Sequence, residues 1–282
     1  MKYCRFLLDG ESRYGAVEER EGELWISELI PAPEEDLAFR VAAAQRDAVD
    51  KVVSEFSAER FEPIRLNEAF LLAPVTPSKI ICVGRNYRDH AKELGNEVPT
   101  EPLLFSKPPS SLLAPGGVVR MPAASSRVDF EGELALVIRR RISRFQAGQQ
   151  ADQDWRSVIR GYTLANDVTA RDLQKKEGQW TRAKGWDTFC PVGPFVSDEV
   201  DPALGLTLET RVNGELRQHG TTSDFIFGIP ELLAYITAAI TLEPGDLVLT
   251  GTPAGVGPLS PGDRVDVSIA GLGVLSNTFQ PE

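Results

Sequence analysis

Histidine and cysteine are scarce in this sequence, which holds two histidines and three cysteines among 282 residues. Zinc sites of the finger type need several of these residues at short spacings. Cys4, Cys82 and Cys190 are widely spaced and form no Cys-x-x-Cys pair. The scarcity argues against a zinc finger and means that a metal site in this chain must rely on carboxylates. The three cysteines fit reduced, buried thiols in a cytoplasmic protein.

Basic residues are also in short supply, because 30 Lys and Arg stand against 41 Asp and Glu and give a net charge of −11. Nucleic-acid binding needs basic stripes that neutralise phosphates, and polybasic membrane binding needs a cationic surface. No window approaches the roughly 20 apolar residues of a membrane-spanning helix, and the N-terminus lacks the apolar segment of a signal peptide. We therefore expect a cytoplasmic protein whose partners are neither nucleic acids nor membranes.

The pattern of apolar residues divides the chain near residue 74. Short strands are predicted at 5–8, 14–18 and 23–26, and apolar residues at three-to-four spacing predict an amphipathic helix over 33–56. Residues 71–78 carry two prolines and suit an extended connector. We predict a small N-terminal α/β domain with its connector over 1–74 and a larger domain over 75–282.

Short apolar runs punctuated by Gly and Pro dominate the larger domain. They predict strands at 80–83, 134–138, 195–196, 206–212, 247–250 and 265–269. Helical patterns are fewer, mainly at 153–160 and 230–240, and the chain lacks the regular alternation of strand and helix that builds a doubly wound sheet. The predicted fold class is α+β, mainly β.

Three acidic residues are the candidate metal ligands. Glu131 and Glu133 would lie on the same face of a strand, with Gly132 leaving room between them, and Asp167 follows an apolar strand that would turn into a helix capped by Thr169. Neighbouring carboxylates repel unless a cation or a proton joins them, and a hard divalent ion accepts such an oxygen set. The alternatives are a solvated polar strand face for the two glutamates and a simple turn for Asn166-Asp167.

Three further segments carry candidate groups. Lys184 lies in a Gly- and Pro-rich stretch that could present an ammonium group to an anion, and Thr252 lies in a glycine-rich loop that could grip a carboxylate. His90 and Glu93 are three residues apart, so that one helical turn would let the carboxylate orient the imidazole as a general base. For each, an ordinary surface turn or a charged helix face is the alternative; the other histidine, His219, is interpreted as part of a hairpin turn.

The order and the residue content of these segments together are far more specific for a protein family than any single segment. The chain contains G-R-N-Y-x-x-H from residue 84, F-x-K-P from 105, D-F-E-G-E-L-A from 129, N-D-V-T-A-R-D-x-Q from 166, K-G-x-D-T-F-x-P-x-G-P from 184 and T-G-T-P-x-G-V-G from 250. Together these motifs strongly resemble the fumarylacetoacetate hydrolase family, from about residue 71 to 278. The first 70 residues match only as a variable extension.

The resemblance implies a roll of mixed β-sandwich type for the catalytic domain, and a homodimer. It also implies Mg²⁺ or Mn²⁺, with Ca²⁺ possible, held by Glu131, Glu133 and Asp167. By the same resemblance, Lys184 would stabilise an enolate, and Gln174 and Thr252 would bind the substrate carboxylate with Arg85 nearby. His90 and Glu93 would activate water from a lid that extends over 93–101. We further expect Arg85, Lys107, Arg171 and Lys184 to form a local cationic cluster around the three carboxylates, which could attract a small anionic substrate.

The expected activity is metal-dependent hydrolysis of a C–C bond in a small acylpyruvate-type 2,4-dioxo acid through a stabilised enolate. The complete His-x-x-Glu pair favours this reaction, because it could activate the attacking water. The same enolate serves an isomerase, tautomerase or decarboxylase of 2-oxo dicarboxylic acids, such as 2-hydroxyhepta-2,4-diene-1,7-dioate or oxaloacetate, and the sequence leaves this alternative open. A non-catalytic metal-binding or ligand-sensing protein is a third possibility.

Overall fold

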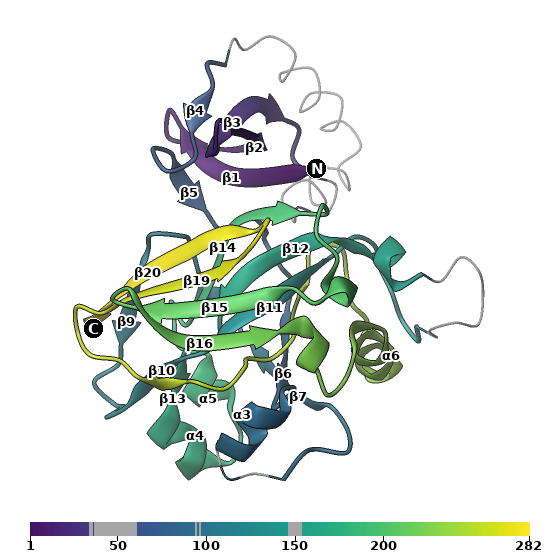
Figure 1. The fold of residues 1–282 in the computed structure, drawn as a ribbon, viewed down its shortest axis with the longest axis vertical. Coiled ribbons are helices and arrows are strands. Elements are labelled where there is room, and N and C mark those ends of the chain that lie inside the picture. The colour runs from purple at the N-terminus through teal and green to yellow at the C-terminus, as the bar shows by residue number, and fades with distance from the viewer. Residues whose placement is uncertain (34–35, 37–60, 94, 96, 146–153) are drawn as a thin grey trace.

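The computed structural model describes residues 1–33, 36, 61–93, 95, 97–145 and 154–282. Within these residues most of the chain is β-structure, arranged as a roll with a small group of strands at one end (Figure 1). The α+β, mainly β prediction is confirmed. The amphipathic helix predicted over 33–56 lies outside the described residues except at positions 33 and 36.

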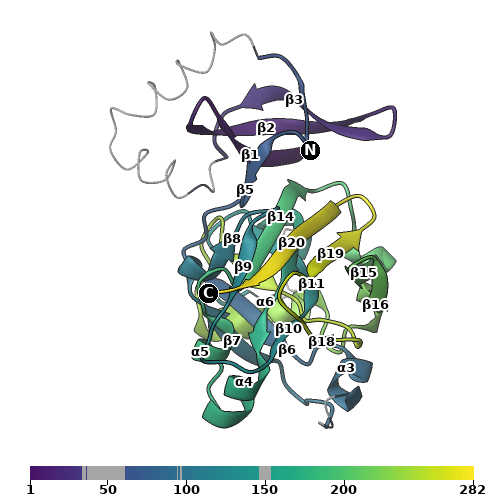
Figure 2. The same ribbon diagram turned by 90° about the vertical axis from the view of Figure 1, so that its left-hand side faces the viewer.

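The N-terminal strands form a small antiparallel group at the top of the molecule in Figure 2. They are β1 (Lys2–Leu8), β2 (Glu11–Arg20), β3 (Glu23–Ile30), β4 (Ile64–Arg65) and β5 (Phe70–Leu72). The turns that join the first three strands are Asp9-Gly10 and Glu21-Gly22, and both residues of each turn have positive φ. This backbone twist suits a two-residue hairpin, so the local sequence dictates the register.

The N-terminal group continues into a large sheet, because β1 pairs with β14 through Lys2–Ser197 and Tyr3–Val196. The strands that follow β1 in spatial order are β14 (Cys190–Ser197), β12 (Ile159–Asn166), β11 (Gly132–Ile138), β17 (Leu247–Leu249), β6 (Ile80–Gly84) and β7 (Leu103–Lys107), while β8 (Leu112–Leu113) pairs with β14 off this path. The predicted domain boundary at residue 74 stays a prediction.

A second sheet packs on the first, with β11, β12 and β14 contacting β15, β19 and β20. Its strands in order are β16 (Glu215–Thr221), β15 (Thr207–Val212), β19 (Arg264–Ile269), β20 (Gly273–Pro281) and β9 (Val118–Met121), and a small third sheet consists of β13 (Thr169–Ala170), β10 (Val128–Phe130) and β18 (Gly257–Pro258). Apolar side chains of the facing strands, such as Leu134, Leu164 and Val267, fill the space between the two larger sheets. Their removal from water is the main contribution to stability.

Helices are short and few among the described residues. They are α3 (Arg88–Glu93), α4 (Arg171–Glu177), α5 (Thr181–Lys184) and α6 (Ile229–Ala239), with 3-10 turns at Pro109–Ser111, Trp155–Val158, Pro202–Leu204 and Thr222–Asp224. In both ribbon views α3, α4 and α5 lie at the end of the roll opposite the N-terminal strands. None of the described helices is long and apolar enough to cross a membrane. The three cysteines are unpaired and buried, as predicted.

Three local predictions are wrong. Within the described part of the helix predicted over 153–160, Trp155–Val158 form a 3-10 turn, and Ile159 and Arg160 already belong to β12, the strand between β11 and β14. His219 lies within β16 rather than in a turn, since Asn213 and Gly214, both with positive φ, make that hairpin turn. Thr169 does not cap α4; it lies in β13, and its hydroxyl donates to the Asp167 carbonyl.

A buried amide fixes the segment that leads into α3. Asn86 is fully buried, and its Nδ2 donates to the carbonyls of Phe227 and Thr250 at 3.2 and 2.9 Å. Its Oδ1 accepts from the Phe227 N–H at 2.8 Å. These three bonds tie the loop after β6 to the end of β17 and to the start of α6.

Exchange of Asn86 for aspartate tests this connection. Asn86→Asp places an oxygen against the two carbonyls that now accept hydrogen bonds, and we expect it to lower the free energy of unfolding by about 3 kcal/mol. Urea denaturation measures the loss, with Gln280→Glu on an exposed strand position as the matched amide-to-acid control. Equal stability of the two variants would contradict this role.

Candidate active site

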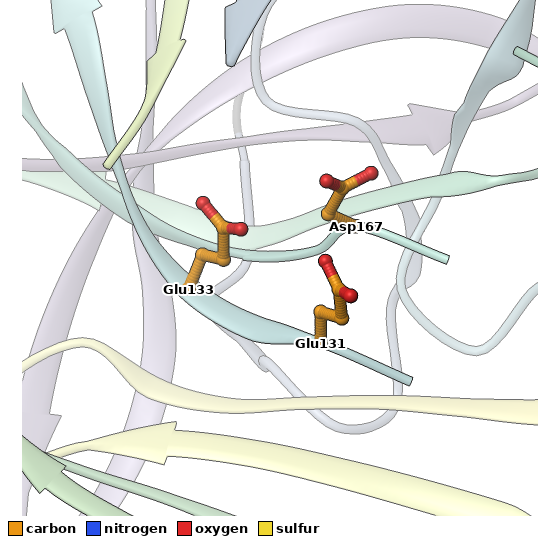
Figure 3. Close-up of side chains that lie close together, drawn as sticks. All are labelled: Glu131, Glu133 and Asp167. Carbon is orange, nitrogen blue, oxygen red and sulfur yellow. The ribbon is translucent and has the colours of Figure 1, made fainter. Parts of the chain in front are cut away.

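Three buried carboxylates converge where β10 leads into β11 and where β12 ends. Oxygens of Glu131, Glu133 and Asp167 lie within 4.8 Å of one another, and none of the three residues is more than 4% exposed. Figure 3 shows the two glutamates projecting from one chain segment toward Asp167, which comes from a second segment. The structure thus brings together the three residues predicted as metal ligands and excludes the solvated strand face as an interpretation.

The backbone explains this convergence. Glu131 lies between β10 and β11, and its N–H donates to Asn166 Oδ1 at 3.0 Å, while the Asp167 N–H donates to the Glu131 carbonyl at 2.8 Å. Gly132 leaves room as predicted, but for another residue: a Cβ at this position would lie 2.2 Å from Thr210 Oγ1 of the second sheet. A glycine is therefore required at this close approach of the two sheets.

Buried cations compensate two of the three carboxylates. Lys184 Nζ donates to Glu131 Oε2 at 2.8 Å and to Asp167 Oδ2 at 2.5 Å, and Lys107 Nζ donates to Asp167 Oδ1 at 2.6 Å. Arg171 contacts Glu131 Oε1 at 2.5 Å and also Asp129. Three members of the predicted cationic cluster therefore contact the carboxylates directly.

The pKa values follow from these contacts. Burial by itself would raise the pKa of Glu131, but Lys184 and Arg171 outweigh burial and hold that pKa far below its ordinary value. Burial likewise disfavours the charged form of Lys184, yet Asp167 and Glu131 bring its pKa above the ordinary lysine value. Both groups are therefore ionised at neutral pH.

Glu133 is the carboxylate without a cationic partner among the described residues. Its Oε2 accepts from the Gly251 N–H at 2.7 Å, while burial, Asp167 and Glu131 all raise its pKa well above the ordinary value. A carboxylate in this position takes up either a proton or a cation. Three buried carboxylate oxygens with one negative charge uncompensated fit a hard divalent ion. Among the described residues the cluster consists of carboxylates alone, an oxygen set that suits Mg²⁺, Mn²⁺ or Ca²⁺.

His90 and Glu93 face the same site from α3. His90 Nδ1 lies 3.4 Å from Glu93 Oε2, and the Glu93 carboxylate accepts from the Gly255 N–H at 3.1 Å. The second contact joins α3 to the glycine-rich loop after β17. Burial lowers the pKa of His90, so the imidazole is neutral at pH 7 and can accept a proton.

All nine residues predicted for the site line one cavity of about 460 Å³. Arg85 reaches it from a backbone position with a φ of 57°, and no ion pair of its side chain occurs among the described residues. Gln174 accepts from Arg171 Nη1 at 2.7 Å through Oε1, which leaves its amide N–H groups for a ligand. Thr252 is 2% exposed. The residues are assembled as predicted, while their individual roles remain predictions.

The cavity also holds residues that the sequence did not single out. Phe105 and Trp180 flank Lys184, whose Nζ lies 4.7 Å from the Phe105 ring centroid, and Arg127 and Lys175 line the cavity as further cations. Phe105 belongs to the F-x-K-P motif, which could have indicated it. No local pattern indicates Trp180 or Lys175, because only the packing of α4 and α5 against β7 and β13 brings them to the cavity.

Comparisons with known proteins identify a matching family and similar proteins. Residues 79–280 match the model of the fumarylacetoacetate hydrolase C-terminal family. An oxaloacetate tautomerase of Bacillus subtilis is 44% identical over 226 residues, covering 75% of this chain and 73% of that protein. A mitochondrial oxaloacetate decarboxylase of Dictyostelium discoideum is 45% identical over 204 residues, covering 70% and 91%. The crystal structure of a Mycobacterium marinum 2-hydroxyhepta-2,4-diene-1,7-dioate isomerase superimposes with a TM-score of 0.81 at 38% identity, covering 100% of this chain and 99% of that one.

Glu133→Gln tests whether the cluster binds a divalent ion. The substitution removes the uncompensated carboxylate and keeps an acceptor for the Gly251 N–H, so the metal-free variant should melt no lower than the unmodified protein. Saturating Mn²⁺ should raise the melting temperature of the unmodified protein by about 4 °C or more. The variant should show little of this increase, whereas Glu231→Gln, an exposed exchange of the same kind, should retain it. A full metal-induced increase in Glu133→Gln would rule out this ligand set.

Proposed function

The chain belongs to the fumarylacetoacetate hydrolase family, and we propose that it is a divalent-metal-dependent enzyme that tautomerises or decarboxylates a small 2-oxo dicarboxylic acid of the oxaloacetate type. The observation that carries this proposal is the buried carboxylate cluster, with Glu133 left uncompensated, beside the ammonium group of Lys184 in a cavity lined by cations. Both reactions pass through an enolate, and such a site is built to stabilise negative charge on oxygen.

Glu131, Glu133 and Asp167 would hold the metal, and the all-oxygen ligand set suits Mg²⁺ or Mn²⁺. When bound, the ion supplies Lewis-acid polarisation of the substrate's 2-oxo group.

Lys184 is the residue that would stabilise the enolate oxygen. Its ammonium group has three protons, and the described residues provide two acceptors, Glu131 and Asp167. The third proton is available to a ligand in the cavity that Lys184 lines. Because Lys184 is 2% exposed, the positive charge acts with little screening by water.

Two further cations favour a substrate with a second carboxylate. Arg85 and Lys175 line the cavity, and neither side chain forms an ion pair within the described part of the chain. The amide N–H groups of Gln174, left free by its bond to Arg171, can bind the carboxylate next to the 2-oxo group. Arg85 and Lys175 can then bind the distal carboxylate, which an acylpyruvate lacks. The B. subtilis and D. discoideum relatives, described as an oxaloacetate tautomerase and decarboxylase, support this choice.

Hydrolysis of an acylpyruvate is the second candidate, and the contact between His90 and Glu93 supports it as it supports tautomerisation. Nδ1 of His90 faces Glu93, so Nε2 is the nitrogen that can take a proton from a water or from a substrate carbon. Hydrolysis and tautomerisation both need such a proton transfer. Decarboxylation needs only stabilisation of the enolate, because loss of CO₂ leaves the electron pair on carbon without a base.

A substrate panel separates these reactions. With Mg²⁺ present, we expect the protein to accelerate keto–enol exchange of oxaloacetate, or CO₂ release from it, more strongly than pyruvate release from acetylpyruvate. Absorbance of the enol, CO₂ and pyruvate would be followed separately. Faster turnover of acetylpyruvate than of oxaloacetate in both assays would favour the hydrolase instead.

His90→Ala assigns the proton-transfer step. Removing the base should lower tautomerisation or hydrolysis by about 10²- to 10⁴-fold and leave decarboxylation within roughly tenfold. Because burial lowers the pKa of His90, the base-dependent rate should be constant near pH 7 and fall only as acid protonates the imidazole below its ordinary pKa of about 6.5. His219→Ala, at the other and exposed histidine, is the matched control. An unchanged rate and pH profile in His90→Ala would exclude His90 as the base.

A further inference from the structure

Gln218 is a fully buried amide that joins the second sheet to the candidate metal ligands. It lies on β16, directly opposite Thr210 of β15. Its Oε1 accepts from the Gly132 N–H at 3.0 Å, and its Nε2 donates to Thr252 Oγ1 at 2.7 Å and to the Pro253 carbonyl at 2.8 Å. One side chain thus reaches both the segment that carries the glutamates and the glycine-rich loop.

The direction of each hydrogen bond in this network is determined. The Gly132 N–H can only donate, so the atom that faces it is the amide oxygen of Gln218, and the amide nitrogen must face Thr252 and Pro253. The Thr252 hydroxyl accepts from that nitrogen and lies 2.8 Å from the Gly132 carbonyl, which can only accept. The hydroxyl proton of Thr252 is therefore committed to Gly132.

These bonds close a ring around Gly132, which lies between Glu131 and Glu133. The pairing of β17 with β11 covers Ala135 to Val137 only, so at Gly132 no strand of the sheet provides hydrogen-bond partners on that side. Side chains of Gln218 and Thr252 take both main-chain polar groups of Gly132 instead. Since glycine has no side chain to anchor, this ring fixes the peptide between the two carboxylates on the side that faces away from β12.

We propose that Gln218 is a positioning residue, which acts through Gly132 to set the spacing of Glu131 and Glu133 and through Thr252 and Pro253 to orient the glycine-rich loop. The inference rests on the proposed function, because the spacing matters only if the carboxylates bind a metal. Residues that orient metal ligands typically contribute about 10- to 100-fold to metal affinity or activity.

The ring also determines which group of Thr252 can bind a substrate carboxylate. Its hydroxyl proton is engaged by Gly132, while its main-chain N–H has no partner among the described residues. Thr252 lines the cavity, so it would offer a carboxylate its main-chain N–H, and Gln218 would determine where that N–H lies. Loosening the loop should then weaken substrate binding without weakening metal binding.

Two substitutions separate the hydrogen bond of Gln218 to Gly132 from its hydrogen bonds to Thr252 and Pro253. Gln218→Met removes every hydrogen bond of the amide, and we expect the Kd for Mn²⁺ to rise at least tenfold and kcat for oxaloacetate to fall about 10- to 100-fold. Gln218→Glu keeps an acceptor for the Gly132 N–H but supplies at most one of the two donors. Its Kd for Mn²⁺ should stay within threefold of the unmodified protein, while its KM for oxaloacetate rises about tenfold.

Thr210→Val is the control, because Thr210 is the equally buried cross-strand neighbour of Gln218 and its hydroxyl has no hydrogen-bond partner. It should leave Kd, kcat and KM within twofold. Mn²⁺ binding is measured by electron paramagnetic resonance, and thermal unfolding of the metal-free proteins separates general destabilisation from a loss of positioning.

A folded Gln218→Met variant with unchanged Kd and kcat overturns the inference. If that variant does not fold, Gln218→Glu decides alone, and an unchanged KM overturns the inference. An unmodified protein that binds no Mn²⁺ overturns the proposed function together with this inference. Normal Mn²⁺ binding and turnover with unaffected Gln218 variants overturn only the positioning role.

Discussion

Electrostatic repulsion among three buried carboxylates is the constraint around which this molecule is organised. Glu131, Glu133 and Asp167 lie within 4.8 Å of one another in the interior, where unpaired charge is very costly. Lys184, Lys107 and Arg171 relieve part of the repulsion, and no cation of the described residues pairs with Glu133. In our proposal a divalent ion completes the arrangement, and strands far apart in sequence hold the carboxylates in place.

The compensating cations also determine what the cavity can bind. If Glu133 is ionised, the three carboxylates and Asp129 carry four negative charges. Buried Lys107, Arg171 and Lys184 carry three positive charges, and the half-exposed Arg127, which pairs with Asp129, carries a fourth. A divalent ion would give the site a surplus of positive charge, to which the rim residues Arg85 and Lys175 add. A dianionic 2-oxo acid complements this surplus, even though the protein as a whole carries a net charge of −11. Arg85 and Lys175 would then determine the specificity for a dicarboxylate over an acylpyruvate. The carboxylate cluster and Lys184 would perform the enolate chemistry that both substrates share.

Much of the site follows from the sequence, because its chemistry lies in short motifs. The pairing of Glu131 with Glu133 follows from strand periodicity, and the motifs that surround Lys184, Thr252 and His90 identify the family. What the sequence does not reveal depends on contacts between sheets. Gln218 lies between an arginine and a histidine on a strand, and only the packing of the second sheet on β11 turns it inward. The helix predicted over 153–160 failed for a related reason, since the pairing of Ile159 with Ile138 starts β12 there and leaves only a 3-10 turn before it.

The central claim is that one divalent ion binds between the three carboxylates. Anomalous diffraction from crystals soaked in Mn²⁺ tests it most directly. We expect one strong anomalous peak in the chain's interior, in contact with oxygens of Glu131, Glu133 and Asp167 and with Lys184 beside it. Crystals soaked at saturating Mn²⁺ that show no peak there, with Lys184 still bridging Glu131 and Asp167, would contradict it.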